Sequence, residues 1–125
     1  MASQVFIGIA DVIHTVARRE DSELRRFSEK GIFSIPELAL VHAVAKELSS
    51  RPSEIFGVPK IKWEMNRSIG AGLTDLIINA PNDDQEKYAI EFKLGGEIDK
   101  WKADIDKLSK IHNQYNCIFC ALADA

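Results

Sequence analysis

Two carboxylates and a lysine, Asp75, Glu91 and Lys93, lie in two short apolar runs of the sequence, 73–78 and 88–93. Both runs are rich in aliphatic, β-branched and aromatic residues, which is typical of β-strands. Because side chains alternate along a strand, Glu91 and Lys93 share one face of the second run. The segment between the runs is dense in turn-forming residues and predicts an antiparallel hairpin.

The register of this hairpin decides whether the two acids meet. A hairpin that is symmetric about Asp83 sets Ile77 opposite Ala89 and Asp75 opposite Glu91, with Cβ atoms of opposed residues ~4.5–5.5 Å apart. A slip of one residue would put the carboxylates on opposite faces. Adjacent carboxylates repel each other, and a hard divalent cation removes that repulsion. The pattern predicts a site for Mg²⁺ or Mn²⁺, with a solvated polar face of an ordinary sheet as the alternative.

A helix is predicted to open at Ser34-Ile35-Pro36-Glu37, with Ser34 as its N-cap, and to run to about Ser49. Ser34 and Glu37 have the spacing of a capping box, with Pro36 in the first turn. Glu37 also lies on the apolar stripe of this helix, which must pack on the sheet.

The remaining elements follow from periodicity. An amphipathic helix is predicted from about Ser3 to Arg19, with a stretch through Glu29 that either continues it or forms a second helix. The segments 50–53 and 56–59 are predicted to be loop and turn, followed by a strand over 60–67 and a glycine-rich bend over 69–72.

The C-terminal third is predicted to be a helix over 98–112 and a strand over 115–122. The helix has an expected buried stripe of Trp101, Ile105, Leu108 and Ile111. Its opposite face is rich in lysine, which is typical of a solvated surface or of one that flanks a phosphate backbone. The strand is almost continuously apolar, which predicts a central place in the sheet.

Length and composition predict one soluble domain, 1–125. The chain has 125 residues, of which 46% are hydrophobic and 28% charged, and a net charge of −3, so no overall basic field attracts nucleic acid. Cys117 and Cys120 form a C-x-x-C on the last predicted strand, which places them on opposite faces. We expect buried structural cysteines, a cytoplasmic location and no signal peptide or membrane span.

Asp75, fifteen intervening residues and then Glu91-Phe92-Lys93 resemble the motif of the PD-(D/E)xK (restriction endonuclease-like) nuclease superfamily, as in its small stand-alone members. The predicted order from residue 34 onward is similar to the αβββαβ core of that family. The resemblance implies an α/β fold in which a mixed central sheet is flanked by helices. Residues 34–125 would form this core, and residues 1–31 an extra N-terminal helical segment. Thr74 stands where the motif has Pro.

The resemblance implies hydrolysis of phosphodiester bonds in nucleic acid, DNA in preference to RNA, with Mg²⁺ or Mn²⁺ as cofactor. The implied catalytic residues are Asp75, Glu91, Lys93 and Glu37, and the implied metal ligands are Asp75, Glu91, the Phe92 backbone carbonyl and Glu37. For Glu37 the capping role and the ligand role are not exclusive.

Further residues have two interpretations. The resemblance makes Glu64, Asn66 and Arg67 accessory to the site, and a solvated edge strand is the alternative. Lys100 and Lys107 either bind phosphate or face solvent. The alternative function is a non-catalytic or assembly-dependent binding module that works as a homodimer or in a larger complex. The intact set of Asp, Glu and Lys favours the enzyme.

Overall fold

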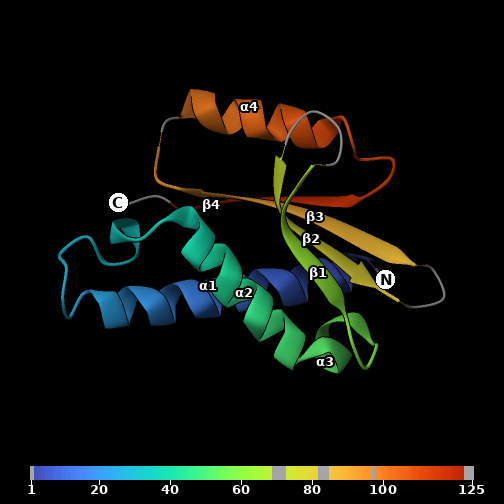
Figure 1. Ribbon diagram of the computed structural model, residues 1–125, viewed down its shortest axis with the longest axis horizontal. Helices are drawn as coiled ribbons and strands as arrows, with labels where there is room; N and C mark the ends of the chain where they lie inside the picture. Colours follow the sequence, from blue (N-terminus) through green and yellow to red (C-terminus); the bar gives the residue numbers. More distant parts are fainter. Residues whose placement is uncertain (1, 69–72, 82–84, 97, 123–125) are drawn as a thin grey trace.

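The computed structural model describes residues 2–68, 73–81, 85–96 and 98–122, which form an α/β fold around a four-stranded mixed sheet (Figure 1). The strands are β1 (Lys62–Ser68), β2 (Leu73–Ala80), β3 (Glu86–Leu94) and β4 (Asn116–Leu122). Their spatial order is β1-β2-β3-β4; the first three are antiparallel, and β4 runs parallel to β3. The predicted α/β class and mixed sheet are confirmed.

Helices cover both faces of the sheet. They are α1 (Ala2–Leu24), the 3₁₀ turn η1 (Gly31–Ser34), α2 (Glu37–Ser50), α3 (Pro52–Phe56) and α4 (Ile98–Ser109). Helices α1 and α2 lie on one side of the sheet and α4 on the other (Figure 1). None of the helices in the described part of the chain is long and apolar enough to cross a membrane.

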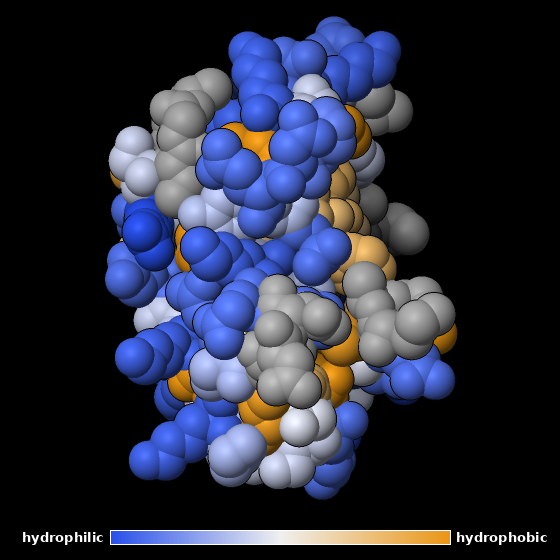
Figure 2. All heavy atoms as spheres, turned by 90° about the vertical axis from the view of Figure 1, so that its right-hand side faces the viewer, coloured by the Kyte–Doolittle hydropathy of each residue, from blue (hydrophilic) through white to orange (hydrophobic). Residues whose placement is uncertain are grey.

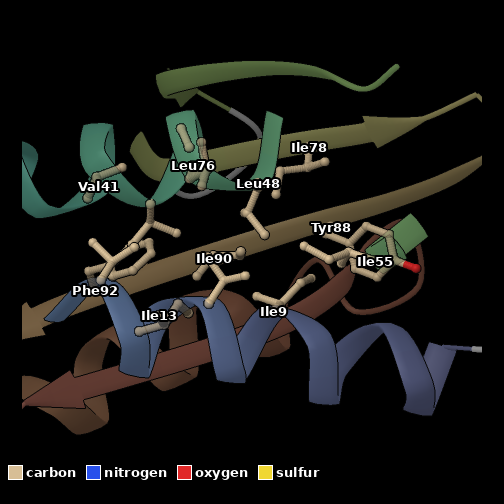
Figure 3. Close-up of a cluster of buried hydrophobic side chains, with 14 of the residues drawn as sticks. Ile9, Ile13, Val41, Leu48, Ile55, Leu76, Ile78, Tyr88, Ile90 and Phe92 are labelled. Atoms are coloured by element: carbon tan, nitrogen blue, oxygen red, sulfur yellow. The ribbon is translucent and has the colours of Figure 1, made fainter. Parts of the chain in front are cut away.

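The main core lies between the sheet and the N-terminal helices. Figure 3 shows side chains of α1, α2 and α3 in contact with side chains of the strands. The helix residues are Ile9, Ile13, Val41, Leu48 and Ile55, and the strand residues are Leu76, Ile78, Tyr88, Ile90 and Phe92. A smaller cluster on the opposite face joins Ile77 and Ala89 to Leu108 and Ile111 of α4 and its C-terminal turn. The even residues of β2 and β3 thus face α1 and α2, and the odd ones face α4.

The predicted hairpin register is correct where the structure describes it. Ile77 pairs with Ala89, and Asn79 pairs with Lys87, which places Asp75 and Glu91 on the α4 face. Asp83 and the predicted bend at 69–72 lie outside the described residues.

Residues Ala2–Leu24 form one helix, which decides between the two alternatives for this segment and ends before Glu29. Two predictions about the N-terminal half are corrected. A short helix, α3, replaces the loop expected at 50–53. Ser34 is not the cap of α2, because its hydroxyl donates instead to the Gly31 carbonyl at 2.6 Å, inside η1. Pro36, in an extended conformation, precedes the helix, so that Glu37 is its first residue and its carboxylate is free to reach elsewhere.

The expected central position of β4 is wrong, because β4 is an edge strand. Its apolar residues have other neighbours: α1 residues such as Ile13 line a groove with residues 118–122 of β4, and α4 packs against β4. Cys117 and Cys120 are free thiols that pack against different core clusters, as expected for opposite faces, but both are only partly buried and not buried as predicted. The side of the molecule seen in Figure 2, on the right in Figure 1, is mostly hydrophilic with small apolar areas.

Helix α1 should contribute strongly to stability through one face. Ile9→Ala should lower the free energy of unfolding by about 2–5 kcal/mol, because Ile9 is fully buried and its loss leaves a cavity. Ile7→Ala on the same helix is the matched control and should change it by less than about 0.5 kcal/mol, because Ile7 is 64% exposed. Equal effects in urea denaturation would contradict this packing of α1.

Candidate active site

The two acids lie where the β2–β3 ladder ends. The last paired residues are Leu76 and Ile90, and beyond them side chains replace the ladder bonds. The Phe92 N–H donates to Asp75 Oδ2 at 2.8 Å, and the Asp75 N–H donates to Glu91 Oε1 at 3.3 Å. Each carboxylate therefore binds the backbone of the opposite strand, and this cross-brace holds the two carboxylates side by side.

Helix α4 places two charged side chains, Asp104 and Lys107, near the two acids. Lys107 Nζ lies 2.9 Å from Glu91 Oε1 and donates to the Leu73 carbonyl at 2.7 Å. Lys93 Nζ lies 3.1 Å from Asp104 Oδ2, within ion-pair distance. Lys93, on β3, therefore points toward α4, on the same face as the acids.

Glu37 approaches the site from the other face of the sheet. Its Oε1 accepts a hydrogen bond of 2.9 Å from the Leu94 N–H, at the last residue of β3. Gly95 and Gly96 then turn the chain with φ of 71° and 88°, which glycine adopts without strain. The Trp101 indole N–H donates to the Gly95 carbonyl at 2.9 Å, so the turn that links β3 to α4 is fixed at the site.

The site has unusual electrostatics because its carboxylates are poorly solvated. Burial raises the pKa of Asp75, and the negative charge of Glu37 and Asp104 raises it further, against the Phe92 hydrogen bond. Burial also raises the pKa of Glu91, where Asp75 adds to the effect and Lys107 opposes it. The two acids therefore destabilise each other's charged forms, as neighbouring carboxylates do when they share one site.

Lys93 has the opposite environment. The Asp104 carboxylate beside it raises the pKa of Lys93, and the charges of Glu37 and Asp75 act in the same direction. Its side chain therefore stays an ammonium at neutral pH and acts as a donor and a positive charge.

The donors suit a hard cation, although they do not form a closed cage. Within the described residues, no three Asp, Glu, His or Cys side chains converge as ligands, so Glu37 is not brought into one ligand group with Asp75 and Glu91. Mg²⁺ commonly binds proteins through only one or two carboxylates and keeps several waters. The Asp75 and Glu91 pair satisfies that requirement.

The accessory residues lie on β1, the strand next to Asp75, and Asn66 stands between Met65 and Arg67, which pair with Leu76 and Thr74 on either side of Asp75. Glu64 and Arg67 are exposed on β1 and form an ion pair of 3.8 Å, and Asn66 is exposed with φ of 55°. Lys100 is exposed on α4, whereas Lys107, expected on the solvent side, faces the sheet. Glu64 pairs with Ile77 and therefore lies on the same sheet face as Asp75, two residues further along the strand.

The expected stripe of α4 missed Asp104 and is wrong at Ile105, which is 48% exposed. Residues 104, 107, 108 and 111 follow the i, i+3, i+4, i+7 spacing of one helix face, and Asp104 and Lys107 are indeed half-buried toward the sheet. The spacing was visible in the sequence. Hydrophobicity alone favours Ile105 for the buried face, whereas the charged residues Lys93 and Glu91 on the facing strand favour Asp104 and Lys107.

Asp75→Asn should stabilise the metal-free protein at pH 7. The folded-state pKa of Asp75 is raised above 3.8, so the native state of the wild type loses stability as pH rises through that pKa. Asn cannot ionise and keeps an oxygen for the Phe92 N–H. The free energy of unfolding of Asp75→Asn should exceed that of the wild type by ~1.4 kcal/mol for each unit by which the pKa is raised. This difference should vanish near pH 3.5. Urea denaturation with EDTA at both pH values tests this; a variant less stable at pH 7 would contradict it.

No protein-family model matches the chain, and neither the curated proteins nor the solved structures contain a match. The geometry and charge of the site are therefore the features that indicate its chemistry. Its central feature is a pair of carboxylates at the end of two strands, with an ammonium on the same face.

Proposed function

We propose that this protein is a nuclease of the PD-(D/E)xK type that needs Mg²⁺ or Mn²⁺. The observation that carries the proposal is the cross-brace of Asp75 and Glu91, which sets two desolvated carboxylates side by side with Lys93 on the same sheet face. Two neighbouring negative charges that are partly removed from water lower the free energy of unfolding. A bound divalent cation compensates that cost.

The element order supports a restriction endonuclease-like core. Helix α2, strands β1 to β3, helix α4 and strand β4 follow one another along the chain, with the short α3 inserted after α2. The sheet is mixed, with helices on both faces, and α1 adds to the α2 side. Asp75 lies on β2, and Glu91 and Lys93 lie on β3, so the motif residues of the resemblance come from two neighbouring strands, which supports the proposal.

The chain's own residues have separate roles in this proposal. Asp75 and Glu91 hold the cation, and the Phe92 carbonyl between the motif residues is a further hard donor. When bound, the cation supplies Lewis-acid stabilisation of the negative charge that develops on the phosphate. Lys93 is a fixed positive charge that can donate to a phosphate oxygen or to the attacking water. Its raised pKa argues against a role as the general base.

The alternative is a non-catalytic binding module on the same fold. One observation favours it: the carboxylates of Asp75, Glu91 and Glu37 already accept backbone hydrogen bonds within the chain. In that case the acids would serve only to join strand ends. A direct assay of cleavage separates the two functions.

Cleavage should require both metal and Lys93. Circular and linear double-stranded DNA, single-stranded DNA and RNA should be incubated with Mg²⁺, Mn²⁺ or EDTA. Lys93→Ala should reduce the cleavage rate by about 10²-fold or more, because it removes a charge that stabilises the transition state. Lys102→Ala is the matched control, since Lys102 is exposed on α4. Cleavage that persists in EDTA, or an equal loss in both variants, would contradict the proposal.

Glu37→Gln separates the bracing role of Glu37 from its charge. The glutamine oxygen can still accept the Leu94 N–H, so the free energy of unfolding should change by less than about 0.5 kcal/mol. The lost negative charge should weaken Mn²⁺ binding several-fold and slow cleavage. Unchanged Mn²⁺ affinity and rate would show that Glu37 only braces the end of β3.

A further inference from the structure

Lys107 is bound in the place where a cation is needed. Its ammonium lies 2.9 Å from Glu91 Oε1, and the side chains are only 22% and 5% exposed. It also donates to the Leu73 carbonyl at 2.7 Å. Within the described part of the chain, no other ammonium or guanidinium lies within ion-pair distance of Glu91. The lysine therefore bridges the start of β2 and the acid of β3.

The charge balance at the site explains this contact. Asp75 and Glu91 are partly desolvated, and Glu37 and Asp104 add negative charge around them. The other lysine of the site, Lys93, is paired with Asp104 at 3.1 Å. Lys107 is thus the positive charge that compensates Glu91 in the metal-free protein, since a buried carboxylate without a partner is strongly destabilising.

The same contact conflicts with metal binding. Glu91 Oε1 already accepts from the Asp75 N–H and from Lys107. An ammonium and a divalent cation on one buried carboxylate repel each other, even on different oxygens, because the repulsion is little screened there. A lysine is a compact charge on a flexible stem, so Lys107 can leave Glu91 without a change in the backbone.

We propose that Lys107 is a built-in counter-cation that competes with the divalent metal for Glu91 and is displaced when the metal binds. This inference rests on the proposed function, because it requires a metal at Asp75 and Glu91. It assigns to Lys107 a positioning role: the lysine keeps the acids together without metal and sets how tightly metal is held. A purely structural lysine would instead support the metal site, and its loss would weaken binding.

The test is the affinity for Mn²⁺, measured from the EPR signal of the free ion. Lys107→Gln removes the charge and keeps an amide donor for the Leu73 carbonyl, and Lys107→Met removes both. Each should lower the Kd for Mn²⁺ about tenfold, because a charge-assisted competitor is lost. Lys107→Arg should stay near the wild type. Lys102→Met is the control for loss of one positive charge on α4, and its Kd should change less than twofold.

The outcomes separate this inference from the proposed function. Mn²⁺ binding that is absent from the wild type and from both neutral variants, or that survives in Asp75→Asn, would overturn the metal site itself. Binding that the wild type shows and Asp75→Asn loses, but that the Lys107 variants leave unchanged or weaken, would overturn the role of Lys107 alone. If Lys107→Met does not fold without metal, Lys107→Gln decides the question.

Discussion

The site depends on the exchange of hydrogen bonds between two carboxylates and the backbones of two strands. At the end of the β2–β3 ladder, Asp75 accepts from the Phe92 N–H and Glu91 accepts from the Asp75 N–H. These bonds satisfy backbone donors that the ladder leaves without carbonyl partners. They also fix the carboxylates at hydrogen-bond range of each other's strand. The bonds that complete the sheet are thus the bonds that create the charged pair.

The negative charges of Asp75 and Glu91 must be compensated by residues of α4. Two poorly solvated acids need compensation, and the helix supplies Lys107 to Glu91, while Asp104 holds Lys93 near the acids. Behind these charges, Leu108 and Ile111 pack on Ile77 and Ala89. The apolar part of α4 secures the helix, and its charged part sets the field at the site. In the proposed metal-bound state Lys107 would leave Glu91, and packing on this face would then be coupled to the chemistry of the site.

The ends of three secondary-structure elements meet beside the carboxylate pair. The first residue of α2, the last residue of β3 and the glycine turn into α4 are joined by the bond from the Leu94 N–H to Glu37 and by the Trp101 indole. The two cores lie on opposite faces of the sheet, and Glu37 reaches around its end. The core that Figure 3 shows packs α2 on the sheet, and the first residue of α2 thereby comes to the end of β3.

The sequence by itself determined the strands, their faces and the hairpin register, because alternation along β2 and β3 and the position of the turn are local properties. It also placed Asp75, Glu91 and Lys93 on one face. Tertiary structure decided the rest. Three features depend on what lies across the interface. Glu37 braces β3 and does not cap its helix, β4 is an edge strand and not a central one, and Lys107 faces the sheet in place of Ile105. Periodicity gives a helix its faces, but only the charge and shape of the opposing surface decide which face is buried.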